Sequence, residues 1–253
     1  MAYDALTQVP YASIETVFLD VGNTLISIDF DWVAAELCAR GLACAADDVR
    51  RAEAVARPDY ARRLFIEGVR GDVDLFRFYL TTMLAELEVV ARLEPAAVDA
   101  LLTGLRAVLR PDGRASVLWR SVMPRVPEAL ARLRDLGLSL VIVSNSDGTV
   151  ERSLEEAGLR PFFSTVIDSA LVGCEKPDPR IFQRALELSG ARADRTLHVG
   201  DIYYADVTGA RGAGVHAVLL DPLDRWTVDD VERLPDLWAV ADRLADARAG
   251  RGR

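Results

Sequence analysis

The chain carries an aspartate, Asp20, at the end of a short apolar run. Residues 17–25 read VFLDVGNTL, in which three apolar residues precede Asp20 and a turn follows at Gly22 and Asn23. A carboxylate at the carboxyl end of a buried strand lies where open α/β sheets bind their ligands. Such a group acts as a nucleophile or as a ligand of a hard cation. Asp20 alone is weak evidence for such a site, because many buried strands end in aspartate.

Three later stretches also place polar residues after apolar runs. They contain Ser144 with Asn145, then Lys176, then Asp201 followed by Asp206. Carboxylates, a hydroxyl, an ammonium group and exposed backbone N–H groups together suit a hard cation beside a phosphoryl group. Lys176 and Ser144 would neutralise and hydrogen-bond the phosphoryl oxygens. Mg²⁺ is the cation that this donor set predicts, since it binds few protein carboxylates and keeps several waters.

Lys176 is the single lysine among the 30 basic residues, all the others being arginines. A compact ammonium group differs from a planar guanidinium in hydration and in charge density. Its use at one position indicates a role there. A coding bias that favours arginine is the alternative, and composition alone leaves both open.

The elements that would position these groups alternate between strand and helix. The hydrophobic pattern predicts strands over residues 15–20, 138–143, 164–167, 196–199 and 216–220. It predicts helices over 124–136, 148–157, 178–189, 205–213 and 229–247. Short strands joined by helices imply a parallel sheet with both faces covered. The carboxyl ends of its strands meet at one edge, which would bring the polar groups together.

A helical stretch interrupts this pattern after the first strand. Apolar residues recur at helical spacing over 31–40, 46–67, 72–89 and 95–110, with breaks at Gly41, Gly68, Gly71 and Pro95 and a turn at Pro111-Asp112-Gly113. We predict an α/β core domain made of residues 1–29 and 115–253. Residues 30–114 would form an all-helical cap domain, inserted after the first strand as a lid.

Four stretches of the chain resemble, in order and spacing, the four motifs of the haloacid dehalogenase-like (HAD) superfamily. They are residues 19–25 (LDVGNTL), 141–145 (VIVSN), 175–182 (EKPDPRIF) and 198–207 (HVGDIYYADV). The resemblance spans nearly the whole chain. It implies a Rossmann-like parallel sheet, and the helical insertion resembles the C1-type cap of this superfamily.

The resemblance also implies roles for individual residues. Asp20 would be the catalytic nucleophile, with Lys176 as the second catalytic residue. The phosphate group would be bound by Ser144, Asn145, Asn23 and Lys176. Mg²⁺ would be bound by Asp20, the backbone carbonyl of Gly22, Asp201 and Asp206. The implied reaction is hydrolysis of a small phosphate monoester through an aspartyl-phosphate intermediate.

Gly22 departs from the family pattern, because phosphatases of this superfamily usually carry a second aspartate there as general acid and base. Such help is worth about 10²–10⁴-fold in rate. Phosphonate-cleaving relatives need a lysine in the cap, and residues 27–121 contain none. Dehalogenases replace the acidic fourth motif, whereas Asp201 and Asp206 are present. We therefore expect a Mg²⁺-dependent phosphatase, either one with an unusual general acid or one acting on phosphates whose leaving group needs little protonation, such as anomeric sugar phosphates or acyl phosphates.

Two further interpretations stay open at Gly22. Asp29 or Asp31 could supply the missing acid, although Asp31 is predicted to cap the first cap helix. Alternatively, the chain is a catalytically silent HAD-fold protein that binds a phosphorylated ligand or a protein partner.

Several other polar residues have simpler readings. Asp206 could cap a helix or orient ligands, and His198, inside a strand, is predicted to be packed in the core. Arg57, Arg62 and Arg63 could hold an anionic substrate, but a solvated helix face is the expected reading.

The bulk composition limits the class of protein. The net charge of −9 over 253 residues argues against nucleic-acid binding, which needs a basic surface. No apolar run is long enough to span a membrane, and the N-terminus lacks the pattern of a signal peptide. The three cysteines, Cys38, Cys44 and Cys174, lack metal-type spacing. We expect a cytoplasmic protein, monomeric or homodimeric, with a small phosphorylated molecule as its partner.

Overall fold

The computed structural model of the chain describes residues 6, 8–68, 74–109 and 118–250. The chain divides into two compact units, one made of Met1–Ser27 and Arg120–Arg253 and the other of Ile28–Trp119. Several predicted features lie outside the described residues, namely the break at Gly71, the first two residues of the helix over 72–89, the turn at Pro111-Asp112-Gly113 and the domain boundary between residues 114 and 115.

Within the described residues, the first unit is built on a six-stranded sheet in the order β5-β4-β1-β6-β7-β8. Its strands are β1 (Thr16–Leu19), β4 (Ser139–Ser144), β5 (Thr165–Asp168), β6 (Thr196–Gly200), β7 (His216–Leu220) and β8 (Arg233–Leu234). Every neighbouring pair is parallel. All four residues of the central strand β1 are buried, as expected of a strand covered on both faces. The predicted parallel α/β fold is confirmed.

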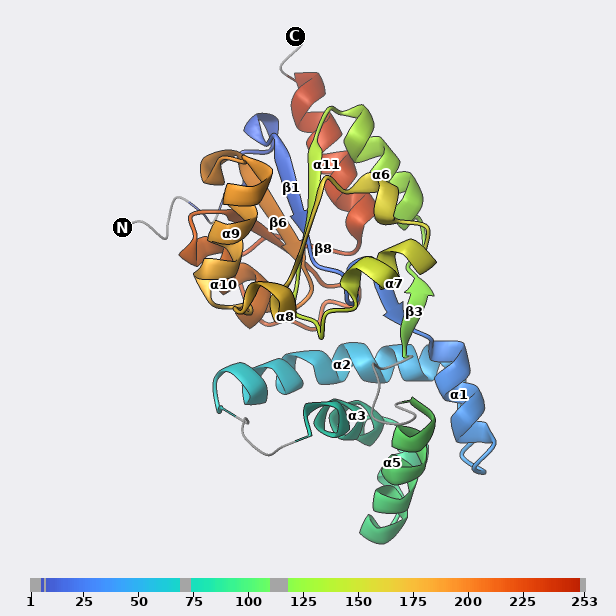
Figure 1. Ribbon diagram of the computed structural model, residues 1–253. Helices are drawn as coiled ribbons and strands as arrows, with labels where there is room; N and C mark the ends of the chain where they lie inside the picture. Colours follow the sequence, from blue (N-terminus) through green and yellow to red (C-terminus); the bar gives the residue numbers. More distant parts are fainter. Residues whose placement is uncertain (1–5, 7, 69–73, 110–117, 251–253) are drawn as a thin grey trace. The chain divides into compact units, whose positions relative to one another are not determined.

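Helices cover both faces of this sheet. On one face α6 (Val126–Asp135) packs against α11 (Leu237–Ala249), and on the other α9 (Pro179–Ser189) packs against α10 (Thr208–Gly212) (Figure 1). Shorter helices, α7 (Val150–Glu156) and α8 (Ser169–Val172), follow β4 and β5. The remaining turns of helix are η2 (Tyr11–Ser13), η4 (Arg160–Phe162), η5 (Ala193–Arg195) and the π-helical turn η6 (Tyr203–Val207).

The predicted final helix over 229–247 is wrong at its start. The chain first forms the edge strand β8, in which the carbonyl of Leu234 accepts a hydrogen bond from the N–H of Asp221 at 2.9 Å. Pro235 disfavours helical backbone at the residue before it. Asp236 then caps α11 by accepting from the N–H of Ala239 at 2.8 Å. The helical spacing of apolar residues continues on both sides of Pro235, but the helix itself begins only after this proline.

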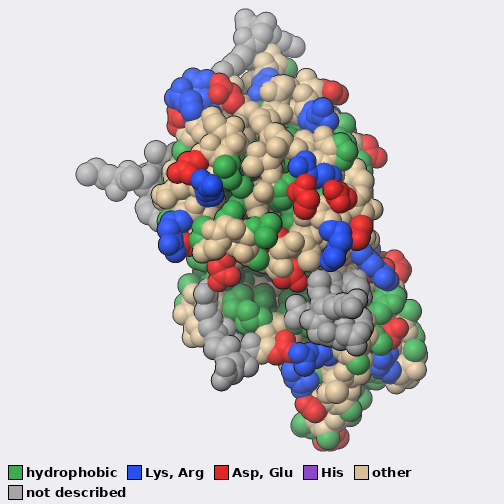
Figure 2. Space-filling model, viewed as in Figure 1, with side chains coloured by type: hydrophobic (Ala, Val, Ile, Leu, Met, Phe, Trp, Pro, Cys, Tyr) green, Lys and Arg blue, Asp and Glu red, His purple; other side chains and the backbone are tan. Residues whose placement is uncertain are grey.

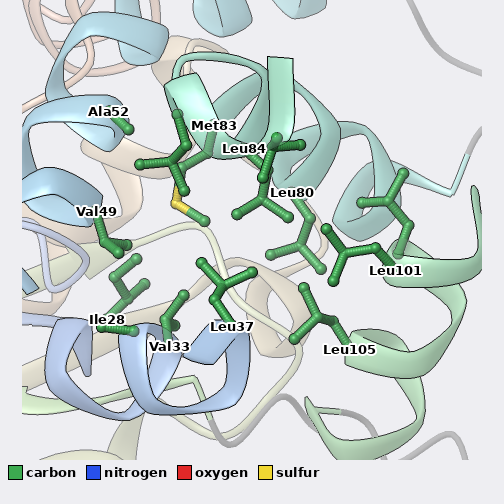
Figure 3. Packing of buried hydrophobic residues seen from close by; sticks show 14 of the residues in the cluster. Ile28, Val33, Leu37, Val49, Ala52, Leu80, Met83, Leu84, Leu101 and Leu105 are labelled. Atoms are coloured by element: carbon green, nitrogen blue, oxygen red, sulfur yellow. The ribbon is translucent and has the colours of Figure 1, made fainter. Parts of the chain in front are cut away.

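The second unit is a cluster of helices with a core of its own. Its helices are α1 (Phe30–Cys38), α2 (Ala46–Phe65), α3 (Leu75–Ala85), α4 (Glu88–Ala91) and α5 (Pro95–Leu109). Apolar side chains from α1, α2, α3 and α5 point toward one another, among them Leu37, Met83 and Leu105 (Figure 3). The strands β2 (Ile26–Ile28) and β3 (Trp119–Val122), which the sequence pattern did not predict, form a two-stranded sheet at the ends of this segment.

Two local predictions in this unit are wrong. The helix predicted over 72–89 is two helices, because Leu87 has an extended backbone between α3 and α4. Leu87 and Val90 both join the buried cluster, so the apolar spacing runs across the break. At the start of α1 the cap is Asp29, not Asp31. The Asp29 carboxylate accepts from the N–H of Trp32 at 2.9 Å, and Asp31 lies in the first turn.

Arg57 does not belong to a solvated helix face as predicted. Its side chain is buried and forms an ion pair with Glu53 one turn earlier in α2, the distance from Nε to Oε1 being 3.1 Å. The hydroxyl of Tyr79 donates to the same glutamate at 3.3 Å. Arg62 and Arg63 keep roughly half of their side chains exposed, at 47% and 42%, and pair with Asp59. Among the described residues of this unit, the Glu53–Arg57 pair is thus buried, whereas the pairs of Arg62 and Arg63 with Asp59 are exposed.

The surface mixes charges of both signs. Figure 2 shows basic side chains interspersed with Asp and Glu side chains over the visible face. Along the described chain, no helix combines the length and the apolar character that crossing a membrane requires.

Truncating the centre of the helical core should destabilise the protein. Leu37 is fully buried, so we expect Leu37→Ala to lower the free energy of unfolding by about 2–5 kcal/mol through lost burial and a residual cavity. Urea denaturation followed by circular dichroism measures this. The matched control is Ile66→Ala, because Ile66 is 64% exposed and its loss should change stability by less than about 0.5 kcal/mol. Equal effects of the two substitutions would contradict the packing described here.

Candidate active site

Three neighbouring strands of the sheet deliver polar side chains to one edge. β1 lies between β4 and β6 and is parallel to both. Asp20 follows β1, Ser144 ends β4 and Asp201 follows β6. The N–H of Asp20 donates to the carbonyl of Val199 at 3.0 Å, which fixes the end of β1 against the end of β6. The convergence that parallel strands impose is therefore present at these three positions.

Lys176 joins this edge from the segment between α8 and α9. Its Nζ donates to Oδ1 of Asp20 at 2.7 Å and to Oδ1 of Asp206 at 2.6 Å. The side chain is almost completely buried, with 3% of its surface exposed. The one lysine of the chain thus lies between two carboxylates that are far from it in sequence.

Asn145 holds the backbone of this lysine. The N–H of Lys176 donates to Oδ1 of Asn145 at 2.7 Å, and Nδ2 of Asn145 donates to the carbonyl of Lys176 at 2.9 Å. Both the oxygen and the nitrogen of the Asn145 side-chain amide are therefore hydrogen-bonded to the backbone of Lys176. The phosphate contact that the resemblance implies for Asn145 stays a prediction, and in the structure its side chain binds the main chain of Lys176.

The carboxylate of Asp20 is held through one of its oxygens. Oδ1 accepts from Lys176 and also from the hydroxyl of Ser144 at 3.0 Å. Oδ2 lies outside these two hydrogen bonds. The two oxygens of Asp20 consequently differ, because Ser144 and Lys176 both donate to Oδ1.

Electrostatic coupling keeps the buried lysine and Asp206 charged. Burial would lower the pKa of the Lys176 ammonium, but the carboxylates of Asp20 and Asp206 act against burial and raise that pKa above its ordinary value. Burial would likewise raise the pKa of Asp206, and Lys176 together with His198 lowers it well below its usual range. Each charge is stable in the interior only because the other is present.

Three buried carboxylates could hold a divalent cation. Asp20, Asp201 and Asp206 each offer an oxygen, and these oxygens all lie within 4.8 Å of one another. An all-oxygen set of this size fits Mg²⁺ or another hard cation.

Asp206 is held by three hydrogen bonds. Its Oδ1 contacts Nζ of Lys176 and Nε2 of His198, the latter at 2.9 Å, and its Oδ2 accepts from the N–H of Ile202 at 2.9 Å. The π-helical turn η6 folds the residue back over Gly200. A Cβ at Gly200 would stand 2.2 Å from Cγ of Asp206, so only glycine leaves room for the carboxylate.

The loop after Asp20 is compact and largely buried. The N–H groups of Leu25 and Ile26 both donate to the carbonyl of Val21, at 2.9 and 3.0 Å. Asn23 is buried and has a left-handed backbone with φ 48°, a conformation that asparagine tolerates better than most residues. Gly22 forms a bridge to Ile26 within this loop.

His198 takes part in the site, although the sequence predicted only a packed core residue. It is fully buried in β6 and contacts Asp206 directly. Its spacing from Gly200 carried a signal, because residues two apart in a strand share a face. The carboxylate of Asp206 packs over Gly200 on that face, so a histidine two positions earlier can reach it.

Comparisons with known proteins agree on one family. A family model described as haloacid dehalogenase-like hydrolase matches residues 14–214. Haloacid dehalogenase-like hydrolase domain-containing protein 3 of Mus musculus is 37% identical over 142 residues, which cover 54% of this chain and 56% of that protein. Phosphoserine phosphatase of Thermus thermophilus is 43% identical over 129 residues, or 49% of each protein. The chain thus spans about half the length of the curated relatives it matches.

A solved structure has the same fold over nearly the whole chain. A HAD hydrolase from Bacillus subtilis, determined with bound magnesium, superposes with a TM-score of 0.63 at 21% sequence identity. The match covers 91% of this chain and 98% of that one.

A methyl group at Gly200 should displace the Asp206 carboxylate. We expect Gly200→Ala to lower the free energy of unfolding by about 1–3 kcal/mol through overpacking, and to abolish any thermal stabilisation by Mg²⁺. The control is Gly212→Ala in α10, where the nearest atom to the new Cβ is 3.4 Å away. This helical substitution should be neutral or stabilise by up to about 1 kcal/mol. Differential scanning fluorimetry with and without Mg²⁺ measures both, and a Gly200→Ala protein as stable and Mg²⁺-responsive as wild type would refute the close approach.

Acidification should destabilise the protein before its carboxylates titrate. Burial lowers the pKa of His198, despite the opposing contact with Asp206, and burial also lowers the pKa of His216. In the unfolded chain both rings take up protons near pH 6.5. Below that pH the unfolded state binds more protons than the folded state, so stability falls as the pH falls. The stability that Asp206 contributes is full above about pH 4 and is lost at still lower pH, because its folded pKa is depressed.

Urea denaturation at pH 8, 7, 6 and 5 tests this sign. The free energy of unfolding should be level above pH 7 and then decline, by at most about 1.4 kcal/mol per pH unit for each histidine. His198 and His216 are the only histidines of the chain, so a variant with both changed to Gln should lose the slope between pH 7 and 5. Persistence of the full slope in that variant would assign it to other groups.

Proposed function

Because the chain belongs to the haloacid dehalogenase-like hydrolase family, we propose that it is a Mg²⁺-dependent phosphohydrolase that acts on small phosphate monoesters. The observation that carries this proposal is the carboxylate of Asp20, held by Lys176 and Ser144 at the edge of the sheet beside two further carboxylates. The name of the Thermus thermophilus relative, a phosphoserine phosphatase, supports a small phosphate monoester as the substrate class.

Asp20 is the proposed nucleophile. Its Oδ1 is held by two donors, so the other oxygen is the one we assign to attack on phosphorus. The bond between this oxygen and phosphorus forms as the bond from phosphorus to the ester oxygen breaks, and the electron pair leaves with that oxygen. Water then attacks the aspartyl phosphate, which releases phosphate and restores the carboxylate.

Lys176 and Ser144 would transfer their hydrogen bonds to the incoming phosphoryl group. Both donors lie at hydrogen-bond distance from the nucleophile, so a phosphoryl group in contact with Asp20 comes within their reach. Charge-assisted donors of this kind stabilise the oxygens of the transferring group. Asn145 would act on the phosphate through its placement of Lys176. Asn23 stays a predicted phosphate ligand.

The acidic cluster is the proposed Mg²⁺ site. Asp20 and Asp201 with the backbone carbonyl of Gly22 would be the direct ligands, and Asp206, whose oxygens already accept three hydrogen bonds, would orient the group around them. Bound there, the cation would offset charge on the phosphoryl oxygens.

Gly22 limits the leaving group. A glycine cannot protonate the departing oxygen, so the substrates that suit this site are those whose leaving group needs little protonation, such as anomeric sugar phosphates and acyl phosphates. The roles of Asp29 and Asp31 as a replacement acid stay predictions, as do the cap function of the helical unit, the cytoplasmic location and the monomeric or homodimeric state.

Gly22 also favours a second candidate, a catalytically silent member of the family that binds a phosphorylated ligand or a protein partner. The two candidates differ on an activated substrate. An enzyme without a general acid still cleaves p-nitrophenyl phosphate, whose leaving group is stable as an anion. A silent protein leaves it intact and is stabilised thermally by phosphorylated ligands.

Substituting the nucleophile tests the proposal. We expect hydrolysis of p-nitrophenyl phosphate by the wild-type protein to require Mg²⁺ and Asp20→Asn to lower kcat by at least about 10³-fold, because no covalent intermediate forms. The control is Asp194→Asn, since Asp194 is exposed and precedes the amino end of β6, whereas the site lies at the carboxyl ends of the strands. A wild-type protein inactive on this ester and on a panel of sugar and acyl phosphates would favour the silent candidate.

A further inference from the structure

His198 is a buried polar side chain to which the proposed reaction assigns no step. It lies in the middle of β6 with none of its surface exposed, and Phe182 packs edge-on against its ring at a centroid distance of 4.9 Å. Its Nε2 is 2.9 Å from Oδ1 of Asp206. Because Asp206 is ionised and only accepts, this nitrogen carries the proton and donates.

The oxygen that receives this hydrogen bond is the one that holds the lysine. Oδ1 of Asp206 accepts from Nζ of Lys176 at 2.6 Å, and Nζ donates in turn to Oδ1 of Asp20 at 2.7 Å. A continuous series of buried hydrogen bonds therefore runs from His198 through Asp206 and Lys176 to the nucleophile. Each of these four residues is at most 8% exposed, so water competes little for the hydrogen bonds.

The other ring nitrogen argues against a purely apolar role. Nδ1 of His198 is buried and, among the described residues, has no hydrogen-bond partner. A buried polar atom without a partner destabilises the folded state relative to an apolar side chain of similar size. What the imidazole adds at this position is therefore the hydrogen bond made by Nε2.

We propose that His198 is a positioning residue, which fixes the carboxylate of Asp206 and thereby holds the ammonium group of Lys176 against Asp20. The inference rests on the proposed function for its effect on turnover. Its structural consequence, the placement of Lys176, is independent of turnover and is measured separately.

Acylation of Lys176 measures the placement directly, because the chain has no other lysine. The reagent is sulfosuccinimidyl acetate, and peptide mapping by mass spectrometry separates Lys176 from the N-terminal amine. We compare wild type with His198→Leu, which removes the donor, and His198→Gln, which keeps an N–H group at about the distance of Nε2. Asn is too short to reach Asp206, so His198→Asn is the matched polar variant without the hydrogen bond.

Positioning predicts that His198→Leu and His198→Asn acylate Lys176 at least about 10-fold faster than wild type, and that His198→Gln acylates it within about 3-fold. His216→Leu is the control for general loosening, because His216 is buried in the neighbouring strand β7 and its Nδ1 also has no partner among the described residues. It should leave the rate unchanged. Equal rates in the Leu and Gln variants at position 198 would overturn the proposal, as would a rate in His216→Leu that matches His198→Leu.

Kinetics give the second readout. With p-nitrophenyl phosphate and Mg²⁺, His198→Leu should lower kcat by about 10–100-fold, the effect of a misplaced catalytic group, and change KM by less than about 3-fold. His198→Gln should restore most of kcat. If wild type hydrolyses no phosphate ester, the proposed function fails while the acylation rates still decide the placement of Lys176. If wild type is active and His198→Leu equals it in kcat, the positioning role fails alone.

Discussion

The buried ammonium group of Lys176 is the interaction on which the rest of the site depends. Its two carboxylate partners come from opposite ends of the chain, Asp20 after the first strand and Asp206 after the sixth. A charge taken out of water is stable only with close partners of opposite sign, and removing one partner of such a group leaves an uncompensated buried charge. Lys176 and Asp206 are therefore coupled in their protonation, and all three residues are coupled in the stability of the sheet edge that carries them.

Backbone geometry makes this coupling possible. Parallel strands bring Asp20 and Asp201 to one edge, but Asp206 reaches them only because η6 turns the chain back over Gly200. π-Helical turns are rare and often occur at functional sites, where they re-aim a side chain. A second close approach occurs at Gly209, where a Cβ would stand 3.0 Å from the backbone of Pro177, the residue after the lysine. The glycines at positions 200 and 209 let β6, α10 and the loop around Pro177 approach closely enough for Lys176 to contact Asp206.

The helical unit obeys a different constraint. Its apolar side chains form a cluster that contains residues of this unit alone. The buried ion pair between Glu53 and Arg57 is local, within α2. Packing of amphipathic helices, rather than convergence of strand ends, determines its structure. The two units therefore respond to different substitutions: cavities in the helical core act through burial, whereas changes at the sheet edge act through charge.

The sequence by itself predicted the parallel α/β fold and the convergence of Asp20, Ser144, Lys176, Asp201 and Asp206, because the hydrophobic pattern identifies the strands and the carboxyl ends of parallel strands meet at one edge of the sheet. The family followed from the resemblance of four motifs. It did not determine that Asn145 holds the backbone of Lys176, that His198 contacts Asp206, or that Arg57 is buried. The sequence also suggested a continuous helix through Leu87 and through Pro235, where the chain turns. Only the tertiary structure decided these points. Hydrogen bonds between side chains remote in sequence, and the burial of a charge, depend on which elements pack together. Apolar spacing indicates which residues are buried but not where the backbone bends.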